Sequence, residues 1–327
     1  MKAIIQEKFG SPSDVLKLKE IGKPLIGDDE VLVRVHAASI HIGDSHMTKG
    51  VPYIMRPIFS LSRAKNGVPG SDIAGVVEDT GQNVTQFGPG DEVFGWCKGA
   101  FAEYASASQG SLTLKPANLT FEQAAAVGVS AFTALQALRD EGDLQSGQKV
   151  LITGASGGVG TFAVQIAKSF GAQVTGVCST RNVEMVKSLG ADHIVDYTQE
   201  DFTQSEDRYH LILDNVGKHS LSDTRETLEP RGVLLSNGAP VSGWVGGLGH
   251  FAGAFVISLF NAQQRRPFVS IPNEADLATL KTLAESGTIV PVIDKVFRFG
   301  QTAQAIDHVG RGHSQGKTIV TMVPGGG

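Results

Sequence analysis

A glycine-rich turn between a strand-like and a helix-like segment carries the clearest chemistry in this sequence. The turn reads GASGGVG, follows the apolar run KVLIT and precedes TFAVQIAKSF. Its candidate phosphate-binding residues are Ala155, Gly157, Gly158, Val159 and Gly160. Small residues there allow a tight turn and a close approach of a pyrophosphate, which the N–H groups of the helix start would bind. The pattern predicts a dinucleotide site, with a purely structural turn as the alternative.

The end of the following strand distinguishes the two common dinucleotides, about 20 residues beyond the turn. An acidic residue there would bind the ribose hydroxyls of NAD, but the sequence has Ser179, Thr180 and Arg181 after Cys178. A guanidinium binds phosphate oxygens through two parallel hydrogen bonds, and the two hydroxyls add donors. The segment therefore predicts NADPH rather than NAD. The alternative is a solvated loop arginine.

Polar residues also follow later strand-like segments. Tyr197 ends HIVDY, Asn215 lies in HLILDNVG, and Asn237 and Gly238 end GVLLSNG. A doubly wound sheet binds its ligand at the carboxyl ends of its strands, so we expect these residues at the cofactor. Two interpretations stay open, because a half-buried tyrosine and turn-forming asparagines would explain the same pattern.

The order of elements indicates an α/β fold with two domains. From about residue 121, strands alternate with helices, which is typical of a Rossmann-type doubly wound parallel sheet. The first 120 residues instead show short strands separated by glycine and proline, which favours a β barrel. We expect 51–70 to form a loop over one face. The strand-like KTIVTMV near the end resembles this first part.

Composition excludes several classes of protein. The chain has 327 residues, 40 glycines, a net charge of −5 and two cysteines. These values disfavour a nucleic-acid partner, a disulfide scaffold and a four-cysteine zinc lobe. The apolar stretch 251–260 is too short to span a bilayer, and the first residues show no secretory signal. We expect a cytoplasmic protein without membrane attachment.

The motifs together resemble the medium-chain dehydrogenase/reductase superfamily, in particular its zinc-free quinone oxidoreductase branch. The resemblance rests on MKAIIQEKFG, VRVHAASIHIGD, VPGSDIAGVVEDTG, GAFAEYA, SAFTAL, GASGGVG, STRN, LGADHIVDY and RGHSQGKTIV. It implies a GroES-like catalytic domain of residues 1–121 and 268–327 around an NADPH-binding Rossmann domain of residues 122–267. It also implies a cofactor in the cleft between them, and a homodimer through a sheet edge near 240–262.

The resemblance assigns further site residues. Ser130 matches a family threonine near the nicotinamide, and Lys317 matches a basic position near the cofactor. Tyr53 lies one residue away from a tyrosine proton donor of related enoyl-thioester reductases; packing is its alternative role. His41 replaces the usual asparagine and could donate a proton to the substrate oxygen, or be a strand-end histidine bound to backbone. Asp44 matches a family residue, which we expect to stabilise the local turn.

The sequence departs from the zinc-dependent relatives. They place a cysteine after VRVHAAS and a His-Glu pair after the Pro-Gly, where this chain has Ser39–Asp44 and Gly70–Asp72. His41, Asp44 and His46 would form an alternative cluster without a thiolate. The sequence thus predicts metal-free hydride transfer from NADPH to a hydrophobic quinone or α,β-unsaturated carbonyl. The alternatives are a zinc-type alcohol dehydrogenase and an NADPH-binding sensor or interaction protein without turnover.

Overall fold

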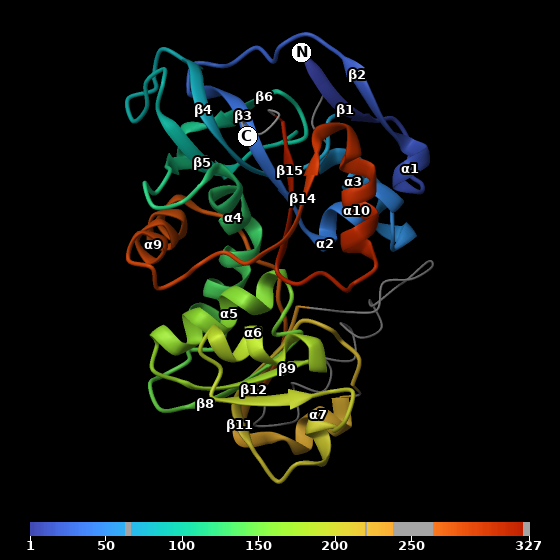
Figure 1. Ribbon diagram of the computed structural model, residues 1–327, viewed down its shortest axis with the longest axis vertical. Coiled ribbons are helices and arrows are strands. Elements are labelled where there is room, and N and C mark those ends of the chain that lie inside the picture. Colours follow the sequence, from blue (N-terminus) through green and yellow to red (C-terminus); the bar gives the residue numbers. More distant parts are fainter. Residues whose placement is uncertain (63–66, 220, 238–263, 323–327) are drawn as a thin grey trace. The chain divides into compact units, whose positions relative to one another are not determined.

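The computed structural model describes residues 1–62, 67–219, 221–237 and 264–322, which divide into two compact units (Figure 1). The first unit comprises Met1–Phe132 and Pro272–Gly327, and the second Thr133–Ile271. The first of the two boundaries lies later than the predicted 121/122, inside helix α4 (Phe121–Gln136). The contacts of α4 therefore change from one unit to the other partway along a helix, not at its start.

The second unit is built on a parallel sheet with the strand order β10-β9-β8-β11-β12-β13. Its strands are β8 (Lys149–Thr153), β9 (Gln173–Cys178), β10 (His193–Asp196), β11 (Tyr209–Asp214), β12 (Leu228–Ser236) and β13 (Gln264–Pro267). Its helices include α5 (Gly158–Ser169), α6 (Val183–Ser188) and α7 (Leu221–Glu226). This order is that of a doubly wound sheet, and it confirms the predicted α/β class.

The ends of α5 follow from local sequence. The helix begins immediately after the glycine turn, and Gly171 follows its last turn with a φ of +78°. Glycine adopts this left-handed conformation without steric penalty, so it suits the position after a helix. The side chains of Val150, Leu151 and Ile152 in β8 are fully buried, because helices cover both faces of such a sheet.

The first unit contains a second sheet, of order β14-β15-β3-β4-β5-β7, with β6 paired to β3. Its strands are β3 (Glu30–Ile40), β4 (Asp72–Thr80), β5 (Glu92–Trp96), β6 (Tyr104–Ser108), β7 (Leu112–Leu114), β14 (Ile293–Arg298) and β15 (Lys317–Thr321). A separate hairpin joins β1 (Lys2–Gln6) to β2 (Leu16–Glu20). Because β15 pairs with β3 in antiparallel register, the end of the chain completes the sheet begun near its start.

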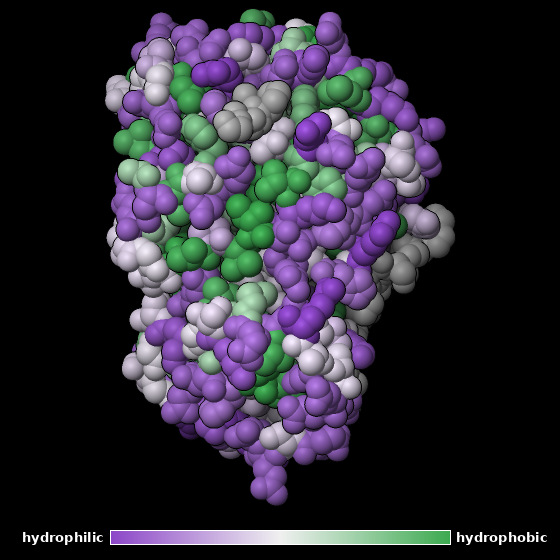
Figure 2. All heavy atoms as spheres, in the orientation of Figure 1, coloured by the Kyte–Doolittle hydropathy of each residue, from purple (hydrophilic) through white to green (hydrophobic). Residues whose placement is uncertain are grey.

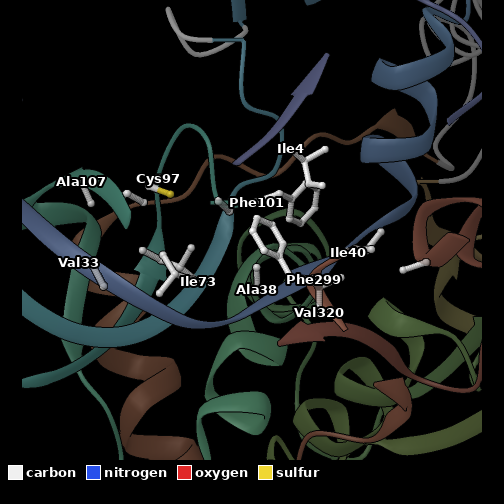
Figure 3. Packing of buried hydrophobic residues seen from close by; sticks show 14 of the residues in the cluster. Ile4, Val33, Ala38, Ile40, Ile73, Cys97, Phe101, Ala107, Phe299 and Val320 are labelled. Carbon is white, nitrogen blue, oxygen red and sulfur yellow. The ribbon is translucent and has the colours of Figure 1, made fainter. Parts of the chain in front are cut away.

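The core of the first unit combines residues from distant parts of the chain. Its buried cluster includes Ile73 and Phe101 from the first 132 residues and Phe299 and Val320 from the last 56. Figure 3 shows these side chains packed in one cluster. The helices α9 (Glu274–Glu285) and α10 (Thr302–Gly310) also belong to this unit.

The structure corrects the prediction for 51–70, which is not a loop throughout. A 3-10 helix covers Tyr53–Met55 and helix α3 covers Arg56–Ser62. Pro57 lies in the first turn of α3, where the missing N–H would have no partner within the helix, so it does not interrupt the helix. Short helices α1 (Pro12–Val15) and α2 (Ile42–Lys49) also interrupt the strands of the first part.

Several predictions fall on residues that the structure does not describe. They are Gly238 as a cofactor ligand, the dimer edge near 240–262 and the apolar stretch 251–260. Among the described residues, no helix has both the length and the apolar character needed to cross a membrane. Figure 2 shows mainly hydrophilic residues on the face that it views.

Candidate functional site

The glycine turn between β8 and α5 has the shape of a phosphate cradle. Gly154 has a φ of +61°, and a Cβ atom at Gly160 would overlap the carbonyl oxygen of Gly154 and the backbone of Ala155. A side chain at Gly160 therefore cannot be accommodated without moving the turn. Ala155 is fully buried, and its N–H donates to the carbonyl of Val177 in β9 at 3.1 Å. The turn is thus held against the second strand.

The N–H groups at the start of α5 are suited to an anion. Gly157 is the residue before the helix, and Gly158, Val159 and Gly160 form its first turn. The N–H groups of a first turn have no carbonyl acceptor within their own helix, and the helix dipole is positive there. Gly158, Val159 and Gly160 thus lie at a helix start that is suited to the pyrophosphate of a dinucleotide, and their contact with phosphate stays a prediction.

The segment after β9 presents one arginine and two hydroxyls. Ser179 is half-buried, whereas Thr180 and Arg181 are exposed. Thr180 Oγ1 donates to Asp196 Oδ2 at 2.5 Å, and this bond is the largest of the influences that hold the pKa of Asp196 below its usual range. Donation from Thr180 to a 2′-phosphate would therefore require this bond to break. Ser179 and Arg181 fit a phosphate site more directly.

Asn182 connects the two segments for which the sequence predicts phosphate binding, and it was not among the predicted site residues. Its side chain is buried, and Nδ2 donates to Ser156 Oγ at 2.8 Å and to Ser179 Oγ at 3.2 Å. Ser156 belongs to the glycine turn, and Ser179 to the segment after β9. The only sequence signal was a polar residue directly after the arginine.

Three more predicted ligands lie at the carboxyl ends of strands. Tyr197 follows β10, has an exposed fraction of 53%, and lies with its ring centroid 5.9 Å from the ammonium of Lys218. Asn237 Nδ2 donates to Asn215 Oδ1 at 2.8 Å, and Asn215 Nδ2 donates to the carbonyl of Thr153 at 3.0 Å. The two asparagines thus tie together the ends of β8, β11 and β12. Their contact with a cofactor stays a prediction.

In the first unit, His41 lies between β3 and α2. Its backbone N–H donates to Asp44 Oδ2 at 2.9 Å. Its ring Nε2 lies 3.1 Å from Ser71 Oγ and 3.6 Å from Asp44 Oδ2. Asp44 is buried, and desolvation raises the pKa of this carboxyl while His41 acts in the opposite direction. Asp44 thus holds the start of α2 and lies beside the imidazole. The arrangement presents a half-buried histidine ring whose Nε2 lies at hydrogen-bond distance from the Ser71 hydroxyl, with the Asp44 carboxylate nearby.

A buried ion pair lies at the start of β4 and of β15. Lys317 Nζ is 3.8 Å from Asp72 Oδ2 and donates to Ser130 Oγ at 2.9 Å. Asp72 also accepts from Ser39 Oγ at 2.9 Å and from the N–H of Val129 at 3.0 Å. Both charged side chains are almost fully buried, and burial lowers the pKa of Lys317.

This pair brings together two residues that the sequence predicted, Ser130 and Lys317. In this structure, Lys317 Nζ donates to Ser130 Oγ. The contact of the two residues with a cofactor stays a prediction. Asp72 was not among the predicted site residues. The sequence signal for it was one aspartate after the Pro-Gly turn, at the place where zinc-dependent relatives have their His-Glu pair.

Tyr53 lies in the 3-10 helix before α3 and has an exposed fraction of 37%. The guanidinium of Arg56 lies 4.4 Å from its ring centroid, and Arg56 Nε donates to the carbonyl of Gly50 at 3.1 Å. These contacts match a packing role. A proton-donor role for Tyr53 stays a prediction.

The side chains that the structure describes are not grouped as the ligand set of a catalytic zinc ion. Within the described ranges, no three side chains of histidine, cysteine, aspartate or glutamate are grouped so that they could hold a metal. In the alternative cluster of His41, Asp44 and His46, Asp44 Oδ2 accepts from the backbone N–H of His41 at 2.9 Å. Both cysteines are buried, and desolvation raises the pKa of Cys178 to about 11.

Two protein families match parts of the chain. Residues 27–117 match the alcohol dehydrogenase GroES-like domain, and residues 189–320 match the family described as zinc-binding dehydrogenase. The first match covers strands of the first unit, including β3, β4 and β5. The second includes part of the parallel sheet and the closing strands β14 and β15.

Individual relatives match over almost the whole chain. The mouse (Mus musculus) protein named NAD(P)H oxidoreductase RTN4IP1, mitochondrial, is 33% identical over 99% of this chain and 89% of its own. The Arabidopsis thaliana protein named NADPH-dependent alkenal/one oxidoreductase, chloroplastic, is 32% identical over 99% of this chain and 80% of its own. The solved quinone oxidoreductase of Coxiella burnetii superimposes with a TM-score of 0.87 at 27% identity, covering 99% of both chains.

Proposed function

Because this chain belongs to the quinone-oxidoreductase-like branch of the medium-chain dehydrogenase/reductase superfamily, we propose that it is an NADPH-dependent oxidoreductase whose hydride acceptor is a quinone or an α,β-unsaturated carbonyl. The observation that carries the proposal is the phosphate cradle at Gly160, followed by Ser179 and Arg181 instead of an acid after β9. The relatives named after alkenal/one reduction and quinone reduction support the acceptor class.

The bound nicotinamide supplies the hydride in such a reaction. The residues of this chain bind and orient the cofactor and provide a proton to the reduced acceptor. The turn at Gly157–Gly160 would hold the pyrophosphate, and Arg181 with Ser179 would hold the 2′-phosphate. His41, with its ring held by Ser71 and Asp44, is the proposed proton donor to the acceptor oxygen.

We further propose that the reaction needs no zinc. Zinc would serve to ionise an alcohol, and a catalytic site holds it with three protein ligands around an open position. The described residues offer no such set, so a conjugated acceptor that needs only orientation and a hydrogen bond is the better substrate. A zinc-dependent alcohol dehydrogenase is the second candidate, because residues 189–320 match a family described as zinc-binding.

We expect the purified protein to oxidise NADPH in the presence of quinones or enones, measured by the loss of absorbance at 340 nm. The panel should include enoyl thioesters, and each assay should be repeated after treatment with a chelator. Activity that survives the chelator supports the proposal. Activity with alcohols that returns only with added zinc would favour the second candidate, and tight NADPH binding without turnover would favour a sensor.

We expect Arg181→Ala to raise the Kd for NADPH about tenfold or more, because a charge-assisted pair with the 2′-phosphate is lost. The Kd for NADH, which has no such phosphate, should change little. Arg208→Ala is a matched control, because Arg208 is an exposed arginine of the same unit at the opposite end of a strand, immediately before β11. Equal weakening of NADPH and NADH by Arg181→Ala would contradict the assigned role.

The homodimer and the cytoplasmic location also stay proposals. The homodimer rests on the family resemblance, and the cytoplasmic location is an alternative to the mitochondrial and chloroplastic locations in the names of two relatives. Light scattering of the purified protein tests the first, since a monomer mass at micromolar concentration would contradict it. Cell fractionation tests the second.

A further inference from the structure

We propose that Asn182 is a positioning residue of the cofactor site, which directs the hydroxyl protons of Ser156 and Ser179 toward the phosphates of NADPH. The inference rests on the proposed function, because it concerns how the same site binds its cofactor. It assigns a task to a buried polar side chain that the cofactor itself need not touch.

The first observation is the bridge that Asn182 makes between two loops. Its Nδ2 atom lies 2.8 Å from Ser156 Oγ and 3.2 Å from Ser179 Oγ, and the asparagine is only 5% exposed. Ser156 comes from the turn between β8 and α5, and Ser179 from the segment after β9. A single amide group thus links the proposed pyrophosphate and 2′-phosphate subsites.

The chemistry of the amide determines the direction of the hydroxyl protons. An NH2 group has two donors and no acceptor, so both serine oxygens must accept from it. Each hydroxyl then keeps its own proton for a different acceptor. Phosphate oxygens are the acceptors that the cradle is built to receive, and such charge-assisted bonds are the stronger kind.

The neighbouring hydroxyl shows the opposite arrangement. Thr180 Oγ1 donates to the ionised carboxylate of Asp196 at 2.5 Å, so its proton points away from any phosphate. Ser179 differs from Thr180 because an amide donor, not a carboxylate, faces its oxygen. The serine is therefore the hydroxyl of this segment that is set up as a phosphate donor, and Asn182 is the residue that sets it.

Asn182→Asp tests the inference with nearly the same shape. A carboxylate would accept the protons of both hydroxyls and leave them no donor for phosphate. We expect the Kd for NADPH to rise about tenfold or more, and the Kd for NADH to rise less because it lacks the 2′-phosphate. Both constants are measured by equilibrium titration without substrate, so turnover does not enter.

A double-mutant cycle separates positioning from added charge. Ser179→Ala alone should weaken NADPH binding more than NADH binding. In that background, Asn182→Asp should lose most of its NADPH-specific effect, because the hydroxyl through which it acts is gone. Asn118→Asp is the matched control. Asn118 Nδ2 donates to the carbonyl of Ala284, and both residues belong to the first unit, so this substitution should change neither Kd.

The possible results distinguish failure of this inference from failure of the proposed function. The inference would be overturned if the ratio of the NADPH and NADH Kd values is unchanged in Asn182→Asp. It would also be overturned if the effects of the two substitutions on Kd multiply in the double variant. In both cases, NADPH binding by the unmodified protein would still support the proposed function. No NADPH binding by the unmodified protein would overturn both. If Asn182→Asp does not fold, Ser156→Ala and Ser179→Ala carry the test, and an NADPH Kd unchanged in either one refutes it.

Discussion

Replacing Asp72 by alanine is expected to lower the free energy of unfolding by about 3–5 kcal/mol, because it leaves the buried ammonium of Lys317 without its counter-charge. The carboxylate also accepts hydrogen bonds from Ser39 and from the backbone of Val129, and the substitution would remove both of these bonds. For a unit of this size, the melting temperature should fall by roughly 6–20 °C. Thermal unfolding followed by calorimetry measures the change.

Asp79→Ala is the matched control for this experiment. Asp79 lies on the same strand, β4, but is exposed, so its removal should change the stability by no more than about 0.5 kcal/mol. The double change Asp72→Ala with Lys317→Met removes both buried charges and should recover part of the loss. Equal stability of the Asp72→Ala and Asp79→Ala proteins would contradict the importance of the buried pair.

The second large effect is expected at His41. If its imidazole supplies the proton, His41→Gln should lower kcat about a hundredfold, which is the lower range for the loss of a general acid. The Kd for NADPH should stay unchanged, because the phosphate-binding residues lie in the other unit.

His308→Gln controls for the loss of a half-buried histidine in the same unit. His308 Nε2 lies 2.6 Å from Asp294 Oδ2, a pair on α10 and β14 that is separate from α2. Its replacement should leave kcat intact. A kcat of His41→Gln within twofold of the unmodified protein would instead show that His41 is not the proton donor.

The glycine turn between β8 and α5 could be predicted because its signals are local. The residues from Ala155 to Gly160 are neighbours in sequence, and a turn that permits no side chain at Gly160 needs glycine wherever it occurs. The alternation of strands and helices likewise predicted the parallel sheet, since a short apolar run indicates each buried strand. These features depend on contacts within about one turn or one strand.

Prediction from the sequence was less successful in two cases. One depended on whether a helix accommodates a proline, and the other on which acceptor a hydroxyl donates to. The prolines near Tyr53 favoured a loop, but Pro57 lies in the first turn of α3, where proline is tolerated. The residue type of Thr180 predicts a donor to phosphate, but its hydroxyl donates to Asp196, which lies on the adjacent strand β10. Neither outcome is encoded by the residue type alone.

The sequence by itself determined the class of fold, the glycine turn between β8 and α5 and the family, because each follows from residue types at short, regular spacings. Only the tertiary structure decided that Asp72 and Lys317 form a buried pair, and that Asn182 faces both Ser156 and Ser179. The physical reason is that burial and hydrogen-bond direction depend on which strands lie side by side. That arrangement is settled when β15 pairs with β3, and β9 with β8.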